Sequence, residues 1–275
     1  MTAKQAAPEN GSAPPLPRQF GAVNWRGLGA LLWRGLWRYV KMAGHTVAGP
    51  CISSLLFLAV FVLAAGGGAE LAPGVPLAQF LVPGIALFQL GHSAFENAGF
   101  PVLDDKLEGM IGDILAAPLT PLETLAGYAV PAALNGLLTG IVVLALAWIF
   151  VDLRVHDAWV LGGFAAVSAL LFALLGTLAG LWADRWEHYA MAENFLILPL
   201  GFLSGTFFTL ASLPETARGL IAFNPVFYAV DGVRYGLTGH AESSLLLGAA
   251  VLLALDLALW LLAWRLFATG YKIKP

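Results

Sequence analysis

The sequence contains few charged residues. Only 11% of its 275 residues are Asp, Glu, Lys or Arg, whereas 59% are apolar. A soluble domain carries about 25% charged residues, so a water-exposed surface cannot be built from this composition. Most of the surface must therefore face lipid, and we predict an integral membrane protein.

Cysteine and the common catalytic motifs are almost entirely missing. Cys51 is the one cysteine, which excludes an intrachain disulfide and a cysteine-rich metal site. The sequence has no G-x-x-x-x-G-K-[ST], H-E-x-x-H, C-x-x-C or G-x-S-x-G, and its five histidines lack metal-ligand spacing. A net charge of −3 without long runs of one sign gives no indication of nucleic acid. We therefore expect no catalytic residue, no metal and no cofactor on this chain.

Long apolar stretches are abundant instead. A transmembrane helix requires about 20 predominantly apolar residues. The sequence predicts an all-α membrane protein with six such helices, at residues 46–66, 78–99, 123–151, 158–183, 190–211 and 245–267.

The N-terminal region divides into two parts. Residues 1–24 are rich in Pro, Ala and Ser and lack the apolar core of a signal peptide, so we expect a disordered cytoplasmic tail that stays attached. Residues 25–41 predict an amphipathic helix in the membrane interface, with Trp25 and Leu32 on its apolar face and Arg34, Arg38 and Lys41 on another. A single membrane domain is predicted over residues 25–275.

The basic residues predict the orientation. With six crossings, 11 of the 14 Lys and Arg residues fall on the side of the two termini. Because Lys and Arg are enriched in cytoplasmic loops, we expect both termini in the cytoplasm.

Two loops differ from simple connections. Residues 100–122 predict a cytoplasmic helix with an apolar face and an acidic back, which fits either a protein partner or packing on the chain's own spans; the negative charge argues against an anionic leaflet. Residues 212–244 are too polar for a full crossing. They predict two short outer re-entrant helices, at 215–223 and 226–237, separated by Asn224-Pro225.

Several polar residues fall within predicted spans. Gln89, His92 and Glu96 share one helix face, where they either line a polar pathway or form an interhelical hydrogen-bond network. For Asp256 we expect a structural partner on a neighbouring helix.

Two motifs resemble the signature of bacterial ABC-2 type transporter permeases. The segment 106–127, KLEGMIGDILAAPLTPLETLAG, carries a basic residue, a glycine, a proline and an L-[ST]-x-x-E element before the third span. The segment 199–234 carries F-L-S-G-x-F-F, Leu213-Pro214, Asn224-Pro225 and Arg234. Lys106 stands where arginine is common in the family.

The resemblance implies a transmembrane subunit with a cytoplasmic coupling helix. Two permeases, here expected to be a homodimer surrounded by membrane lipid, would sit on two ABC ATPase subunits, which bind ATP and Mg. The expected coupling residues are Asp105, Lys106, Glu108, Gly109, Ile111, Leu115, Pro118 and Leu119. The expected substrate pathway comprises Phe88, Gln89, His92, Glu96, Phe195, Phe202, Ser204, Thr206 and Phe207. The expected outer gate comprises Asn224, Pro225, Asp231 and Arg234.

The leading hypothesis is therefore a permease in the bacterial inner membrane that exports an amphipathic, lipid-like, drug or glycan substrate by alternating access. Two alternatives stay open. One is a membrane scaffold or assembly protein without transport. The other is an ion-coupled carrier that uses Glu96 and Asp256 as proton sites.

Overall fold

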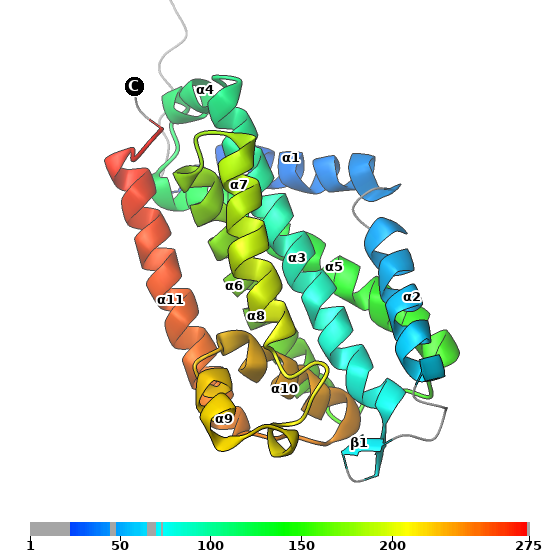
Figure 1. The fold of residues 1–275 in the computed structure, drawn as a ribbon. Coiled ribbons are helices and arrows are strands. Elements are labelled where there is room, and N and C mark those ends of the chain that lie inside the picture. Colours follow the sequence, from blue (N-terminus) through cyan, green and yellow to red (C-terminus); the bar gives the residue numbers. More distant parts are fainter. Residues whose placement is uncertain (1–22, 45–47, 65–69, 73, 274–275) are drawn as a thin grey trace, which may run out of the picture.

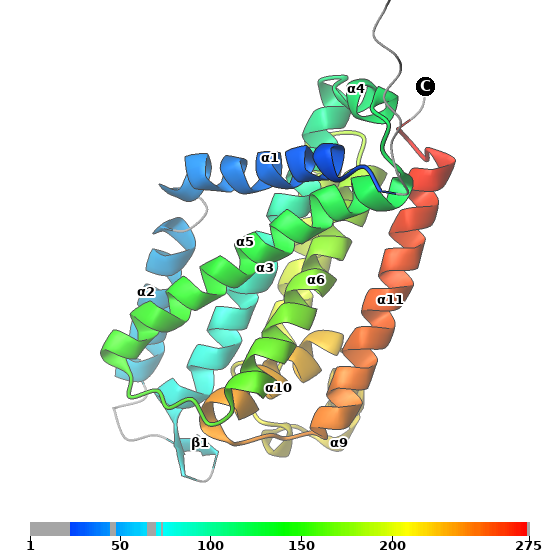
Figure 2. The same ribbon diagram turned by 180° about the vertical axis from the view of Figure 1, so that it is seen from behind.

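The computed structural model of the chain describes residues 23–44, 48–64, 70–72 and 74–273. Its helices form a bundle that runs between two ends of the molecule, with α1 lying across one end (Figures 1 and 2). The longer helices are α1 (Trp25–Ala43), α2 (Gly49–Ala64), α3 (Leu77–Leu107), α5 (Pro121–Phe150), α6 (Ala158–Trp182), α10 (Pro225–Thr238) and α11 (Leu245–Thr269). The shorter elements are β1 (Glu70–Ala72), β2 (Val75–Pro76), α4 (Ile111–Ala116), α7 (Trp186–Ala192), the π-helical turn η2 (Glu193–Ile197), α8 (Leu198–Phe202), η3 (Leu210–Ser212) and α9 (Glu215–Ala222).

Among the described residues, three helices are long and apolar enough to cross a membrane: α5, α6 and α11. Their ends are set by local capping. Thr120 and Glu123 form a reciprocal capping box at the start of α5, and the Asp157 carboxylate accepts from the Trp159 amide at the start of α6. Gly270, with a φ of +71°, ends α11. These three helices agree closely with predicted spans three, four and six.

The centre of the bundle is the packing of α3 between α5 and α6. Glycines bring the backbones together there: a Cβ added at Gly176 of α6 would lie 2.1 Å from the Phe95 carbonyl oxygen, and one at Gly136 of α5 would lie 2.6 Å from that of Leu90. Small residues permit this approach of helices in membranes. The middle of α3 therefore lies at the depth of the middles of α5 and α6.

The prediction of one separate helix over residues 100–122 is wrong. The helix predicted at 78–99 continues without interruption to Leu107, and a turn at Gly109 separates it from the six-residue α4. Pro101 does not end α3 because Val102 and Leu103 continue into the core, where both are fully buried. That burial offsets the backbone hydrogen bond that a proline removes.

The prediction of an uninterrupted fifth span over 190–211 is also wrong. The helical segment runs through α7, η2 and α8 and ends at Phe202, and Gly205 then takes a φ of +73°. The Asn224 side chain donates to the carbonyl oxygens of Leu200 and Leu203, each at 2.9 Å. It thus satisfies acceptors that the next helical turn would otherwise have used.

Helix α1 ends two residues later than the predicted interfacial helix, and its faces point in other directions than predicted. Trp25 and Trp33 are exposed, whereas Arg34, expected on an outward basic face, points into the protein and pairs with Asp105. Gly35 lies against Pro131 of α5, which brings α1 close to that helix. The exposed residues of α1 therefore include three tryptophans, Trp25, Trp33 and Trp37, beside Arg26 and Lys41.

The outer segment, residues 203–244, contains the two predicted short helices. They are α9 and α10, with Asn224 capping α10 at the Val226 amide and Pro225 in its first turn. Together with β1 they lie at the end of the bundle opposite α1, α4 and the C-terminus (Figure 1).

Candidate functional site

The predicted coupling residues lie around the turn that follows α3. Gly109, with a φ of +77°, reverses the chain between α3 and α4. The side chains of Leu107, Glu108 and Met110 are exposed, as are Gly112 and Asp113. We call residues 107–113 the 107–113 turn. It projects from the same end of the molecule as α1 and the C-terminus (Figure 1).

Asp105 lies behind this turn rather than on it. Its carboxylate is 1% exposed, pairs with the Arg34 guanidinium of α1, and accepts a hydrogen bond of 2.6 Å from the Tyr128 hydroxyl of α5. One carboxylate therefore joins α1, α3 and α5. The sequence could not indicate this contact, since Arg34 and Asp105 are 71 residues apart.

Lys106 connects the same end of α3 to α6. Its ammonium donates to the carbonyl oxygens of Leu181 and Ala183, at 2.8 and 2.6 Å. Cations near the carboxyl end of a helix satisfy its free carbonyls and its dipole. Next to this contact, Asp184 accepts from the Lys272 ammonium at 2.6 Å, and this hydrogen bond lowers the pKa of the Asp184 carboxyl.

The other predicted coupling residues are distributed unevenly. Ile111 is buried, Leu115 and Leu119 are half-buried, and Pro118 is exposed. The Pro118 carbonyl oxygen accepts from the Asn24 side chain at 3.1 Å, and the Asn24 amide donates to Glu123 at 2.5 Å. Thus the chain on both sides of the 107–113 turn is fixed to α1, α5 or α6, while the turn itself is exposed.

A cavity of about 130 Å³ lies between α2, α3 and residues 201–207. Five of the predicted pathway residues line it: Phe88, Gln89, Phe202, Thr206 and Phe207. Ser53, Ser54, Phe57, Ile85 and Gly201 complete the lining. The sequence prediction missed the contribution of α2, because Ser53 and Ser54 are its only hydroxyl side chains in an otherwise apolar stretch.

Four predicted pathway residues do not line this cavity: Ser204, Phe195, His92 and Glu96. Ser204 is buried and hydrogen-bonds to the Gly201 carbonyl and the Thr206 hydroxyl, so it holds the 203–207 backbone in place. Phe195 lies on η2 and its side chain is exposed to the exterior of the bundle.

His92 and Glu96 lie beside a third ionisable residue, Glu193. The Nδ1 atom of His92 is 3.5 Å from Glu96, one turn further along α3, and its Nε2 atom is 2.7 Å from Glu193 on η2. We call these three residues the His92 cluster. Gln89, predicted to share this face, is 3.4 Å from the Pro50 carbonyl of α2 instead.

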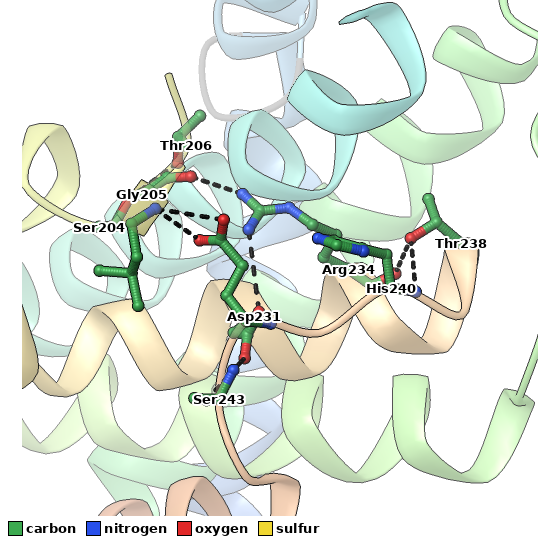
Figure 3. Close-up of polar contacts among 10 residues, drawn as sticks. Ser204, Gly205, Thr206, Asp231, Arg234, Thr238, His240 and Ser243 are labelled. Atoms are coloured by element: carbon green, nitrogen blue, oxygen red, sulfur yellow. Dashed lines mark hydrogen bonds and ion pairs between the residues drawn. The ribbon is translucent and has the colours of Figure 1, made fainter. Parts of the chain in front are cut away.

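Two of the four predicted outer-gate residues, Asp231 and Arg234, form a buried network (Figure 3), whereas Asn224 and Pro225 lie at the start of α10. The Arg234 side chain is fully buried, donates to the Gly205 carbonyl at 2.5 Å, and stacks on Phe80 at 3.8 Å. Asp231 lies 3.9 Å from Arg234 and accepts from the Ser243 amide and hydroxyl. These contacts join α3, α10 and both ends of the outer segment.

Glu242 adds a further connection across the outer segment. Its carboxylate accepts from the Leu210 amide at 3.1 Å, and burial raises the pKa of this group. Glu242 therefore connects Leu210, through its carboxylate, to Asp231, which accepts from the Glu242 amide. Arg234, next to Asp231, adds the bond to the Gly205 carbonyl.

Asp256 does not have the structural partner that the sequence led us to expect. Its carboxyl group is 5% exposed, and neither oxygen has a hydrogen-bond partner in the described part of the chain. The expectation of a partner on a neighbouring helix is therefore wrong for this structure.

Comparison with known proteins gives one family. The family model described as "ABC-2 type transporter" matches residues 26–238. The inner membrane transport permease YadH of Escherichia coli strain K12 is 30% identical over 251 residues, which cover 91% of this chain and 98% of that protein. Nodulation protein J of Rhizobium leguminosarum bv. trifolii is 28% identical over 236 residues, covering 80% of this chain and 83% of that protein. Nodulation protein J of Neorhizobium galegae is 27% identical over 246 residues, covering 84% and 88%.

Proposed function

The chain belongs to the ABC-2 type transporter family as a multi-pass permease subunit of the inner membrane, and on that premise we propose that it exports an amphipathic substrate from the cytoplasm. Membership of the family implies an ABC ATPase partner. In our proposal, two copies of that ATPase bind ATP and Mg and drive two copies of this permease, which form a homodimer in the lipid bilayer. The substrate is lipid-like, a drug or a glycan carrier.

The exposed 107–113 turn carries the coupling proposal. Glu108, Gly109 and Met110 are exposed and form no side-chain hydrogen bond or ion pair within the described residues, while Asp105 and Lys106 shortly before them are bonded to three other helices. A rigidly held projection of this kind transmits force from a partner without bending. We therefore assign the ATPase contact to the turn and the transmission to Asp105 and Lys106.

Basic residues support a cytoplasmic location for this end. The helices and turns that meet at this end carry eight basic residues: Arg26, Arg34, Arg38, Lys41, Lys106, Arg185, Arg265 and Lys272. By the positive-inside rule, this distribution favours a cytoplasmic location for both termini. The six crossings of the proposal are α2, α3, α5, α6, the segment from α7 to α8, and α11. Helix α1, with Trp25 and Trp33 exposed, would lie in the interface on the same side.

The cavity between α2, α3 and residues 201–207 supports the pathway proposal. It is apolar with a few polar groups, as ligand sites are, and it is bounded by the break after Phe202. The outer segment closes its far end through Arg234 and Asp231. ATP binding would move α3 and open this route, provided that the substrate binds the two states with different affinity.

Reconstitution tests the proposal. The chain is co-expressed with an ABC ATPase from the same organism, purified, and assayed for ATP hydrolysis in proteoliposomes. We expect a complex whose hydrolysis is lost in Met110→Asp. It should be retained in the control Val155→Asp, since Val155 is exposed in the connection between α5 and α6 at the other end of the bundle. The proposal would be contradicted if the chain purified without any ATPase, or if Met110→Asp left ATP hydrolysis unchanged. Either result would favour a membrane scaffold.

A further inference from the structure

The His92 cluster lies at membrane depth. His92 is on α3 between Leu90 and Phe95. The Leu90 carbonyl oxygen lies against Gly136 in the middle of α5, and the Phe95 carbonyl oxygen lies against Gly176, six residues before the end of α6. Ionisable groups at this depth are costly and mark sites of function. The side chains of His92 and Glu193 are each 23% exposed, and that of Glu96 is 45% exposed, so the cluster opens to one side of the bundle.

The cluster carries an excess of negative charge. With both carboxylates ionised, a protonated His92 leaves one net negative charge and a neutral His92 leaves two. In the described part of the chain, neither Glu96 nor Glu193 forms an ion pair with a lysine or arginine. A charge that is not compensated inside a membrane is strongly unfavourable, so this site is completed either by protonation of a carboxylate or by a bound positive group.

The apolar cavity lies one helical turn from the cluster along α3, and no residue of the cluster lines it. Phe88 lines the cavity, and its ring lies 6.1 Å from that of His92, one helical turn away. From Phe88 to Glu96 is eight residues, or about 12 Å along the helix. The cavity volume of about 130 Å³ is close to that of an engineered cavity of roughly 150 Å³ that binds benzene. An aromatic group in the cavity and a positive group at Glu96 therefore fit one elongated molecule.

We propose that Glu96 and Glu193, held apart by His92, bind the positive group of the cargo, and that the cargo is an amphiphilic cation with an apolar, ring-sized body. The proposal rests on the export function above and names the class of its substrate. Glu96, the more exposed carboxylate, contacts the cation. Glu193 pairs with His92 more closely and acts as a positioning residue.

An organic cation and a metal ion are the two kinds of positive group that this site could take. Ligand atoms of His92, Glu96 and Glu193 all lie within 4.8 Å of one another, as a metal ion would require. His92 nevertheless faces Glu96 with Nδ1 and Glu193 with Nε2, so its two ring nitrogens face different carboxylates. A zinc ion would require both carboxylates on the side of the ligating nitrogen. An ammonium group needs only carboxylate oxygens in its neighbourhood, and it has no fixed coordination geometry.

Binding of a matched pair of probes tests the proposal. Phenylhexylamine and phenylhexanol share one apolar body and differ in charge. Each is measured by equilibrium dialysis on the permease in nanodiscs of zwitterionic lipid, after subtraction of binding to protein-free nanodiscs. We expect the amine to bind at least about tenfold more tightly than the alcohol, and Glu96→Gln to remove that difference. Glu187→Gln, which removes an exposed carboxylate of α7, is the control, and we expect it to retain the preference for the amine.

Three results would overturn the inference. The amine and the alcohol bind equally, or Glu96→Gln leaves the preference for the amine intact, or ZnCl₂ binds the permease with an affinity lost in Glu96→Gln and displaces the amine. The last result identifies a metal site. If ATP hydrolysis still depends on the permease in any of these cases, the export function stands and only the cationic cargo fails. Loss of the ATPase complex itself counts against the export function instead.

Discussion

Arg34 on α1 and Asp105 on α3 form an ion pair that is closed on its inner side by the Tyr128 hydroxyl of α5. The pair lies directly before the 107–113 turn. It fixes the orientation of an interfacial helix, a central helix and a candidate span relative to one another. Any force applied at the turn therefore reaches three helices through one carboxylate.

The first prediction concerns this pair. Asp105→Asn leaves the Arg34 guanidinium without its ionic partner in a half-buried position, and removing one partner of a buried pair costs about 3 kcal/mol. We expect the thermal unfolding midpoint in detergent to fall by about 6 °C or more. The neighbouring Asp104→Asn is the control and should leave the midpoint unchanged. If the Asp105→Asn protein is as stable as the wild type, the ion pair does not fix α1 against α3 and α5.

The second prediction concerns the turn itself. Gly109 has a φ of +77° and no atom within 4 Å of an added Cβ, so Gly109→Ala meets no steric contact and suffers only backbone strain. That strain is about 1 to 2 kcal/mol. We expect weaker stimulation of the ATPase with little loss of folded protein, measured by hydrolysis in proteoliposomes and by size-exclusion chromatography. Gly219→Ala on α9, also open around its Cβ but without a positive φ and outside the turn, should behave like the wild type.

The third prediction concerns the crossing of α3 and α6. A side chain at Gly176 would collide with the Phe95 carbonyl oxygen, which is backbone and cannot rotate away. We expect Gly176→Ala to lower the thermal midpoint by several degrees and Gly176→Leu to prevent folding. Gly162→Ala on the same helix, with no atom within 4 Å of the added Cβ, is the matched control. Equal midpoints for the alanine variants at 162 and 176 would be incompatible with this crossing.

The fourth prediction concerns the outer segment. Arg234→Met keeps much of the side-chain length but leaves the Asp231 carboxylate buried without its cation. We expect a loss of about 3 kcal/mol and a faster labelling of cysteines placed in residues 206–209 by an impermeant maleimide. Arg218→Met, on the exposed helix α9, is the control. Unchanged labelling in Arg234→Met would mean that this network does not close the outer end.

The sequence predicted the parts of the fold that rest on local signals. The long apolar runs of α5, α6 and α11, and the Asn224-Pro225 boundary between α9 and α10, were read correctly. The end of α8 at Phe202 was missed, because the residues that follow are as apolar as those before and the break depends on Asn224, some 20 residues later. The same limit applies to Arg34, whose inward direction depends on Asp105.

The candidate site was partly predictable for a similar reason. Helical spacing brought His92 and Glu96 to one face, but Glu193 could be added only once η2 was seen packed beside α3. Lys106 begins the recognised motif and Asp105 directly precedes it, yet both side chains bind within the chain. A motif indicates where a residue stands, and the packing decides in which direction it points.

Cross-linking from the 107–113 turn tests the central claim most directly. A photoreactive benzophenone amino acid replaces Met110 in one protein and Trp159 in another, and each is irradiated in membranes that contain the co-expressed ABC ATPase. Both positions are exposed, but Trp159 begins α6 at the opposite end of the bundle. We predict a covalent adduct with the ATPase from position 110 and none from position 159. No adduct at position 110, or equal adducts at both, would contradict the account.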